Sequence, residues 1–289
     1  MVTDTFETIT YETIDDGTIA RIALNRPEKR NAQNSQMLYE VHDAFMAAAL
    51  DDSVKVIVLK GEGPMFSSGH DIRGGSQNGY THDQIFPYSP GLPGSEGYMN
   101  REQEIYFQWC RRIHDIPKPT IAQVHGKVIA GGLMLMWVCD LIVAADNSEF
   151  IDITAGPQFM VQGVEWFSHP WELGTRKAKE MLFTGDPVTA AEAYNLGMIN
   201  HVVPLDDLEE TTLALARKIA ARSNFGLNLA KMAVNQALDA QGFWTAQQAA
   251  FNLQHLGHTH SRVLGMLEAQ KQAAAEQAAP APDGVTTAN

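Results

Sequence analysis

Two glycine-containing turns are the segments of this sequence whose residue types and spacing suggest chemistry. The first is PMFSSGHDI at 64–72, and the second is HGKVIAGGLMLMWVCD at 125–140. Each is predicted to join a strand to a helix, where backbone N–H groups lack partners and can point at a ligand. Two such groups aimed at one carbonyl oxygen would form an oxyanion hole, in which each donor is typically worth about 3 kcal/mol in the transition state. The alternative is that these glycines only permit tight turns.

Candidate acid and base groups lie in the segment SEFIDITAGPQFMVQGVEWFSHPWELG at 148–174. Glu165 and His169 are four residues apart, so they would share one face if this segment is helical. A Glu–His pair could then act as one base with an orienting partner. Asp152 is the other nearby candidate. The structural alternatives are that Asp152 caps a strand end, Glu165 caps the following helix, and His169 bonds a backbone carbonyl.

The elements that must position these groups alternate along the chain. Buried apolar runs and an Asp16-Gly17 turn predict strands, and periodic apolar faces predict helices. Predicted strands cover 6–14, 17–25, 54–59, 120–126, 140–145, 148–152 and 198–203. One predicted helix is capped by Asn34 or Ser35, and another begins near Gly131. Further predicted helices cover 100–116, 175–184, 189–196, 205–222, 224–240 and 242–275. This alternation is typical of an α/β fold.

The domain organisation follows from shifts in composition. A change near residue 205 predicts an α/β core over 1–204 and a helical region over 205–275. An Ala- and Pro-rich tail at 276–289 is expected to be disordered. Residues 74–99 are rich in Gly, Pro and Ser, and such a long irregular stretch suggests either a mobile active-site loop or a disordered insert.

Overall composition excludes several classes of partner. Lys plus Arg number 21 and Asp plus Glu number 34, a net charge of −13, which disfavours nucleic acid and anionic membranes. Cys110 and Cys139 form no CxxC motif, as expected of a reduced protein. The N-terminus lacks signal-peptide features, and the longest apolar run, 128–139, is too short to span a bilayer. We therefore expect a cytoplasmic protein with no nucleic-acid or membrane partner.

Common catalytic and metal motifs are absent. No GxxxxGK[ST], GxGxxG, HExxH or GxSxG sequence occurs, which argues against phosphoryl transfer, dinucleotide binding, zincin chemistry and the hydrolase elbow. His255, His258 and His260 lie close together, but no carboxylate or cysteine accompanies them at ligand spacing. They are interpreted as a polar helix face, so no metal site is predicted.

Four ordered stretches resemble the crotonase (enoyl-CoA hydratase/isomerase) superfamily. The resemblance spans about residues 10–260, and its motifs are NRPEKRNA at 25–32, FSSGHDI at 66–72, HGKVIAGGLMLMWVCDLIVAA at 125–145 and KEMLFTGDPVTAAEAYNLGMINHVV at 179–203. It implies a spiral of ββα units with a helical C-terminal trimerisation region. It also implies assembly as a homotrimer or a dimer of trimers. The implied ligand is an acyl-CoA thioester, with coenzyme A as part of the substrate and no other cofactor.

The same resemblance assigns individual residues. The oxyanion donors map to the backbone N–H groups of His70 and Gly131, where they would stabilise the enolate oxygen of a thioester. Asp71, next to the first donor, is expected mainly to hold the turn. Contacts with CoA and the acyl group map to Lys29, Arg30, Ala32, Ser68, Ile72, Met134 and Thr154.

The sequence departs from the hydratase pattern at the acid/base positions. Hydratases of this family use two glutamates, and the corresponding positions here are Met134 and Thr154, neither of which can serve as a carboxylate. Glu165 and Asp152 are therefore the catalytic candidates, and hydratase turnover is expected to be weak. A single carboxylate suffices to move a proton between two carbons. Isomerase-type chemistry therefore tolerates the absence of the two glutamates better than hydration does.

The sequence thus predicts an acyl-CoA-metabolising lyase or isomerase, with a place in fatty acid metabolism. It would stabilise a thioester enolate in a backbone oxyanion hole. Two alternatives remain open. One is a non-catalytic acyl-CoA-binding homologue, and the other is a C–C bond hydrolase of the same fold that acts on a β-diketone.

Overall fold

A computed structural model describes residues 6–72, 82–89, 91–156 and 163–278. Its main sheet has the strand order β1-β2-β3-β4-β6-β9. β1 and β2 form an antiparallel hairpin, and every later neighbour pairs in parallel. The strands are β1 (Ile9–Ile14), β2 (Ile19–Leu24), β3 (Val56–Gly61), β4 (Thr120–Val124), β6 (Leu141–Ala145) and β9 (His201–Val203). The hairpin expected at Asp16-Gly17 is confirmed, and both residues adopt positive φ there.

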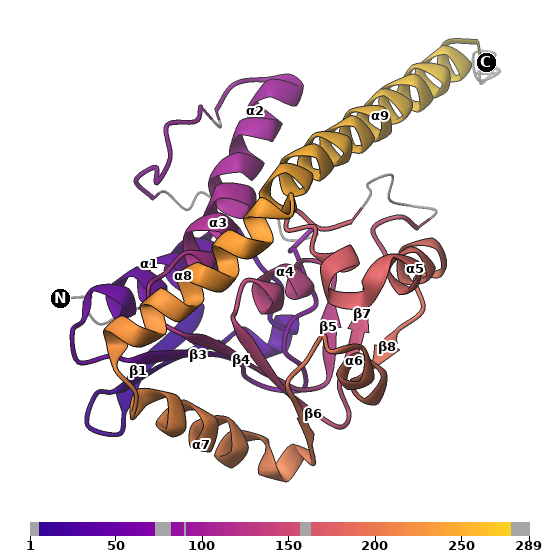
Figure 1. Ribbon diagram of the computed structural model, residues 1–289. Helices are drawn as coiled ribbons and strands as arrows, with labels where there is room; N and C mark the ends of the chain where they lie inside the picture. Colours follow the sequence, from indigo (N-terminus) through magenta and orange to yellow (C-terminus); the bar gives the residue numbers. More distant parts are fainter. Residues whose placement is uncertain (1–5, 73–81, 90, 157–162, 279–289) are drawn as a thin grey trace, which may run out of the picture.

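A smaller sheet lies beside the first (Figure 1). It consists of β5 (Lys127–Ile129), β7 (Glu149–Ile151) and β8 (Val188–Thr189), with β5 and β7 parallel. Ser67 forms an isolated bridge with Val128, which ties the first glycine turn to this sheet. Both predicted oxyanion turns therefore lie where the two sheets meet.

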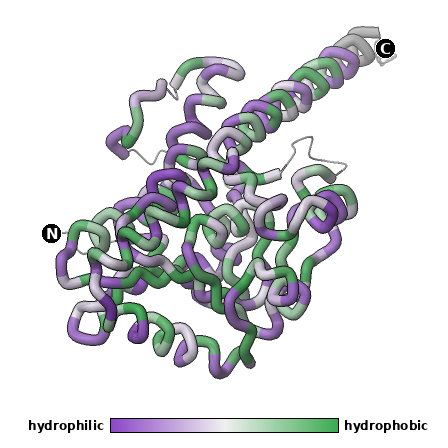
Figure 2. The backbone as a smooth tube through the Cα atoms, viewed as in Figure 1, coloured by the Kyte–Doolittle hydropathy of each residue, from purple (hydrophilic) through white to green (hydrophobic). Residues whose placement is uncertain are grey.

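Helices cover both faces of the main sheet, as parallel strands require. On one face, α1 (Ser35–Leu50), α3 (Gln108–His114) and α4 (Gly131–Trp137) share a core with the sheet that includes Ile57, Phe45, Trp109 and Leu133. On the other face, α7 (Leu208–Ala220) packs on Val56, Val58 and Ile121. Figure 2 shows hydrophobic residues concentrated along these central strands, whereas polar and apolar residues mix along the projecting last helix.

The remaining elements extend the helical part of the molecule. α9 begins against the body and projects away from it (Figure 1). These elements are a 3-10 turn (Pro27–Lys29), α2 (Gly94–Glu102), a π-helical turn (Gln103–Phe107), α5 (His169–Thr184), α6 (Ala190–Leu196), a second 3-10 turn (Leu205–Asp207), α8 (Asn224–Ala240) and α9 (Phe243–Ala278). None of the helices in the described ranges combines the length and apolar character that a bilayer span needs.

Most predicted elements are confirmed, with three corrections at their ends. The helix expected from residue 100 begins earlier, because α2 starts at Gly94 inside the stretch predicted to be irregular. α5 begins at His169, before the expected 175, with a break at Gly174. α9 continues to Ala278, past the expected start of the tail, and residues 279–289 lie outside the described residues. Residues 73–81 and 90 of the Gly- and Pro-rich stretch also lie outside them.

The division expected near residue 205 remains a prediction. α7 contacts β2, β3, β4 and β6, so this first helix after the division packs with the α/β core. In contrast, α8 buries none of its residues in the single chain.

Candidate active site

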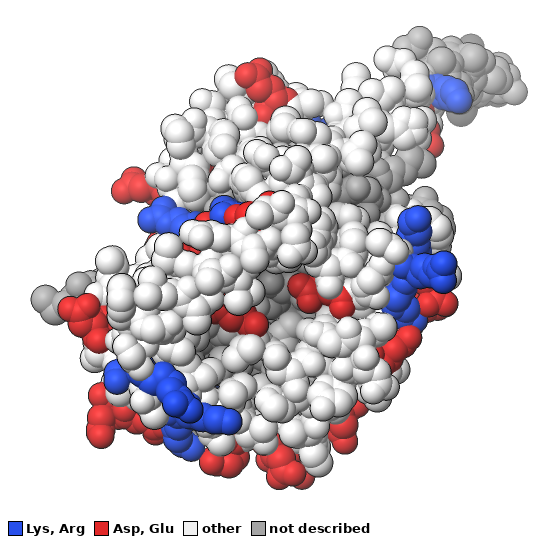
Figure 3. Space-filling model, in the orientation of Figure 1, with Lys and Arg blue, Asp and Glu red and all other residues white. Residues whose placement is uncertain are grey.

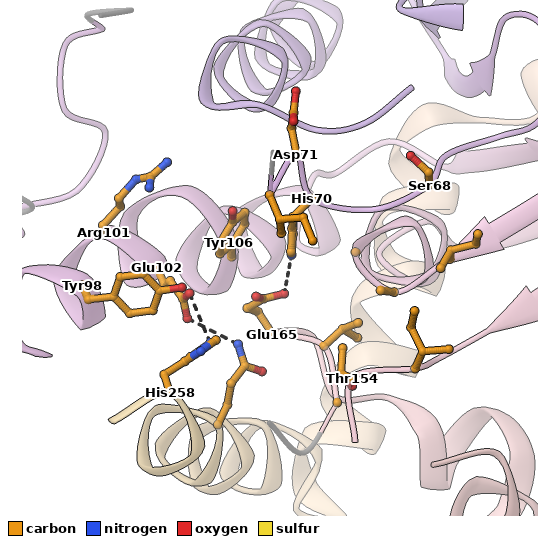
Figure 4. A pocket seen from close by; sticks show the side chains of 18 residues that line it. Ser68, His70, Asp71, Tyr98, Arg101, Glu102, Tyr106, Thr154, Glu165 and His258 are labelled. Atoms are coloured by element: carbon orange, nitrogen blue, oxygen red, sulfur yellow. Dashed lines mark hydrogen bonds and ion pairs between the residues drawn. The ribbon is translucent and has the colours of Figure 1, made fainter. Parts of the chain in front are cut away.

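One pocket collects the predicted oxyanion turns and Glu165. Its walls come from six separate stretches of the chain. The lining residues are Ser68, His70, Asp71, Ile72, Tyr98, Arg101, Glu102, Tyr106, Ile129, Ala130, Gly131, Ile153, Thr154, Gly163, Val164, Glu165, Gln254 and His258. Figure 4 shows how the labelled side chains surround the cavity.

The two glycine turns touch at this pocket. Gly69 has φ +86°, and a Cβ built there would lie 2.7 Å from the carbonyl oxygen of Ile129 and 3.1 Å from the nitrogen of Gly131. Only glycine permits this approach. Ala130 holds the second turn at φ 46°, a region that costs a non-glycine residue about 1–3 kcal/mol. The backbone N–H groups of His70 and Gly131 donate no hydrogen bond within the described part of the chain.

The segment NRPEKRNA braces the first of these turns from behind. The buried Asn31 side chain donates from Nδ2 to the carbonyl oxygens of Glu62, Met65 and Phe66. Ser67 Oγ donates back to the carbonyl of Asn31 at 2.8 Å. The motif that resembles a CoA-binding stretch is thus also a structural support for the oxyanion turn.

Asp71 also holds this turn. Its carboxylate lies 3.2 Å from the Arg26 guanidinium, and its backbone N–H donates to Gln33. Arg26 also donates to the carbonyl of Ala32. These contacts support the expectation that Asp71 keeps the turn in place.

Glu165 and His70 form an ion pair at the centre of the pocket. Glu165 Oε2 lies 2.9 Å from His70 Nε2, and only 5% of Glu165 is exposed. The His70 ring packs on Tyr106 with ring centroids 4.2 Å apart. Figure 4 shows the Glu165 carboxylate pointing toward His70. The dyad joins two predicted site residues, although the sequence did not predict that they pair.

The electrostatics of this dyad favour its charged form. Burial opposes charge on both groups, but each partner outweighs that penalty for the other. The carboxylate of Glu165 raises the pKa of His70, and the imidazolium of His70 lowers the pKa of Glu165. Glu165 Oε1 makes no hydrogen bond to another residue in the described segments. Glu165 can therefore present an ionised oxygen to a ligand in the cavity.

Asp152 and His169 form a second pair that does not line the pocket. Both side chains are fully buried, and Asp152 Oδ2 lies 2.8 Å from His169 Nε2. The other oxygen, Oδ1, accepts from the backbone N–H and hydroxyl of Thr154. Hydrogen bonds from His169 and Thr154 outweigh burial and lower the pKa of Asp152. Removing one member of such a buried pair typically lowers the free energy of unfolding by about 3–5 kcal/mol. The pair is therefore important for the stability of the fold.

The expected Glu165–His169 pairing is wrong. Residues 163–168 are not helical, and α5 begins only at His169, so the four-residue spacing does not place the two side chains on one face. Each finds a different partner, Glu165 with His70 and His169 with Asp152.

The predicted binding residues divide into two groups. Ser68, Ile72 and Thr154 line the pocket. The remaining four do not. Lys29 and Arg30 are exposed, Ala32 is half-buried and Met134 is fully buried in the core on α4.

Several lining residues were not predicted from the sequence, among them Tyr98, Glu102 and Gln254. They lie on α2 and α9, which meet only in the folded chain, so no local spacing could reveal them. His255 and His258, predicted to form a polar helix face, lie near the buried Glu102 carboxylate. No group of three or more His, Cys, Asp or Glu side chains in the described ranges is arranged to hold a metal ion.

Comparison with known proteins supports the resemblance of the four motifs. The family model described as "Enoyl-CoA hydratase/isomerase" matches residues 15–275. A protein of Mycobacterium tuberculosis named "Putative enoyl-CoA hydratase EchA13" is 45% identical over 268 residues, which cover 88% of this chain and 82% of the relative. These matches span nearly the whole described fold.

Solved structures agree with the sequence matches. A probable enoyl-CoA hydratase from Mycobacterium smegmatis superposes with a TM-score of 0.80 and 43% identity, covering 89% of this chain and 97% of the other. An enoyl-CoA hydratase/isomerase from Xanthobacter autotrophicus Py2 gives a TM-score of 0.77 and 30% identity, covering 96% and 100%. The crotonase-type α/β fold with C-terminal helices is therefore confirmed. The chain belongs to the enoyl-CoA hydratase/isomerase family.

Proposed function

We propose that this enzyme forms and reprotonates the enolate of an acyl-CoA thioester, with Glu165 as the proton-transfer group. The observation that carries the proposal is the Glu165 carboxylate, buried and held toward a pocket whose wall contains two unbonded backbone N–H groups. A buried, ionised carboxylate facing a cavity is the arrangement that proton abstraction needs. It also favours an enzyme over a non-catalytic acyl-CoA-binding homologue.

The proposed reaction begins when the thioester oxygen accepts hydrogen bonds from the N–H groups of His70 and Gly131. Glu165 removes a proton from the α-carbon, the C–H electron pair forms the new C=C bond, and the C=O π pair moves onto that oxygen. The two N–H groups stabilise the negative charge that develops there. Glu165, now a carboxylic acid, returns the proton to the α-carbon, or to the γ-carbon when the acyl group is unsaturated. The second outcome is isomerisation.

The His70 side chain acts as a positioning residue for Glu165, which can be tested with pH. In His70→Gln, the backbone N–H remains but the imidazolium is lost, so burial is opposed less strongly and the pKa of Glu165 rises. Glu165 must be ionised to act, so the acid limb of kcat/KM should move to higher pH. A pH–rate profile of both proteins tests this. An unchanged acid limb would show that His70 does not set the charge of Glu165.

Hydration is expected to be slow in this enzyme. Met134 is buried and outside the pocket, and Thr154 hydrogen-bonds to Asp152, so neither supplies the second carboxyl group that hydratases use. A panel of saturated and unsaturated acyl-CoAs should therefore reveal isomerisation or α-proton exchange before hydration. Hydration of crotonyl-CoA at about 10² s⁻¹, a rate typical of efficient enzymes, would contradict this.

The protein carries a net charge of −13, so its overall charge does not attract the anionic coenzyme A. Binding must depend on cationic side chains close to the CoA site. On the face of the molecule drawn in Figure 3, Lys and Arg side chains lie in separate groups and form no continuous basic surface. Lys29 and Arg30 are exposed, and the carbonyl of Arg30 accepts a hydrogen bond from the backbone of Ser68 in the pocket wall. This proximity supports their proposed role as partners of the CoA phosphates.

Assembly as a homotrimer, or as a dimer of trimers, is part of the same proposal. α8 buries no side chain within the chain and exposes large apolar residues on more than one side. A helix of this kind needs a partner surface. The exposed residues on it are Phe225, Leu229, Met232 and Val234.

A further inference from the structure

One end of the pocket is polar, and the proposed proton transfer does not use it. It is formed by Tyr98 and Glu102 on α2 and by Gln254 and His258 on α9, called here the polar end. In Figure 4, Tyr98, Glu102 and His258 lie across the cavity from Ser68, with Glu165 and Tyr106 between the two sides. A ligand bound at the oxyanion turns would reach the polar end with a part remote from its thioester.

Glu102 organises the polar end. Its side chain is 5% exposed and accepts from Gln254 Nε2 at 3.3 Å. The Nε2 atoms of His255 and His258 lie 3.1 and 3.4 Å from the same carboxylate. Three side chains of α9 thus converge on one buried carboxylate of α2. They leave it little freedom to turn toward another partner.

Gln254 presents an unsatisfied acceptor at this end of the cavity. Only 1% of Gln254 is exposed, and its Nε2 is engaged by Glu102. Its Oε1 is buried and has no hydrogen-bond partner among the residues that the structure describes. Leaving a buried acceptor unpaired costs about 1–3 kcal/mol. A hydrogen-bond donor on a ligand would remove that cost.

The polar end is also held firmly in place. The Arg262 guanidinium on α9 donates to the carbonyl of Gly94 and lies 4.2 Å from the centre of the Tyr98 ring. The hydroxyls of Ser95 and Thr259 are 3.3 Å apart. These contacts tie α2 to α9. The unpaired oxygen of Gln254 therefore lies between two helices that are fixed to each other.

The charges around the polar end decide which group it would accept. Glu102 and Glu165 are two carboxylates that face the same cavity; His70 balances the charge of Glu165, and Glu102 would repel an anion at the polar end. Burial lowers the pKa of His258, which keeps that ring neutral near pH 7. Arg101 also lines the cavity, but it donates to Ser35 Oγ. A methyl-terminated chain would leave Gln254 Oε1 unpaired. A neutral group that donates a hydrogen bond therefore matches the polar end best.

We propose that the polar end selects acyl-CoA substrates whose acyl group carries a hydroxyl group remote from the thioester. That hydroxyl donates to Gln254 Oε1. The proposal rests on the proposed function, because it takes the pocket to be the acyl-binding site. It predicts that matched acyl groups with and without the hydroxyl differ in affinity, and that the difference depends on Gln254.

The test is calorimetric titration of the full-length protein with saturated acyl-CoAs of four to ten carbons. Each chain length is measured as three thioesters that end in a methyl, a hydroxyl or a carboxylate. At the length that fits, the hydroxyl form should bind about tenfold more tightly than the methyl form, about 1.4 kcal/mol. In Gln254→Met, which keeps the side-chain length but lacks the acceptor, that ratio should fall to about one. Gln248→Met, at an exposed position of α9, is the matched control and should keep it.

The outcomes separate this inference from the proposed function. Failure of every acyl-CoA to bind overturns both. Binding without preference for the hydroxyl, a preference for the carboxylate, or a hydroxyl preference that survives in Gln254→Met overturns the inference alone. The ratio of two dissociation constants within one preparation does not depend on the folded fraction. A destabilised Gln254→Met variant that still binds acyl-CoA therefore remains informative. If Gln254→Met fails to fold, the wild-type protein still tests the inference, because its ratio must be near ten.

Discussion

Glu165→Gln should lower kcat for α-proton exchange by about 10²–10⁴-fold, because the amide cannot accept the proton that the carboxylate removes. Glutamine keeps the shape of the side chain and can still accept a hydrogen bond from His70, so the variant should fold and bind acyl-CoA. Steady-state kinetics and calorimetric titration of the same preparation measure the two effects separately. Glu180→Gln, a matched change on the surface of α5, should leave kcat unchanged.

The contrary result would be a Glu165→Gln enzyme that keeps more than about a third of the wild-type kcat, since general-base contributions are rarely that small. Proton transfer would then belong to another group. Among the lining residues, Glu102 would be the remaining candidate. Asp71 is paired with Arg26, and Asp152 does not line the pocket.

Gly131→Ala should lower kcat/KM by about 10²–10³-fold without unfolding the protein. A Cβ built at Gly131 lies 2.6 Å from Cε1 and 2.8 Å from Nε2 of His70. The ring must therefore move and break its 2.9 Å contact with Glu165, and the new methyl lies beside the Gly131 N–H donor. The backbone of Gly131 is helical, so alanine is allowed there and favours α4 by up to about 1 kcal/mol. Kinetics together with thermal unfolding test both halves of this prediction.

A double-mutant cycle with His70→Ala separates the two causes. In that background no ring opposes the new methyl group, so Gly131→Ala should cost less than it does in the wild type. Equal costs in both backgrounds would mean that the ring contact is irrelevant and that the methyl acts on the oxyanion donor alone. Wild-type activity in Gly131→Ala would contradict the assignment of this donor.

The sequence predicts the parts of this site that depend on local pattern. The apolar run at 54–59, the Asp16-Gly17 turn and the cap at Asn34 or Ser35 each carry their own signal. The turn forms as predicted, the strand lies at 56–61, and Asn34 is the cap. The two oxyanion turns are recognisable for the same reason, since a glycine at a strand–helix junction is a local requirement.

What the sequence could not predict are the pairings made by distant segments. Glu165 meets His70 from 95 positions away, and Gln254 meets Glu102 from 152 positions away. The position of Glu165 depends on an irregular segment before α5, where periodicity gives no information. α2 forms inside a Gly- and Pro-rich stretch, where its packing on α9 outweighs a weak local preference.

The most direct test of the central claim is deuterium exchange at the α-carbon of a bound acyl-CoA. The wild-type protein is incubated with a saturated acyl-CoA in D₂O, and the α-protons are followed by NMR. The account predicts enzyme-dependent loss of the α-proton signal, and in Glu165→Gln a rate lower by about 10²–10⁴-fold. Tight binding of acyl-CoA with no α-proton exchange in the wild type would contradict it.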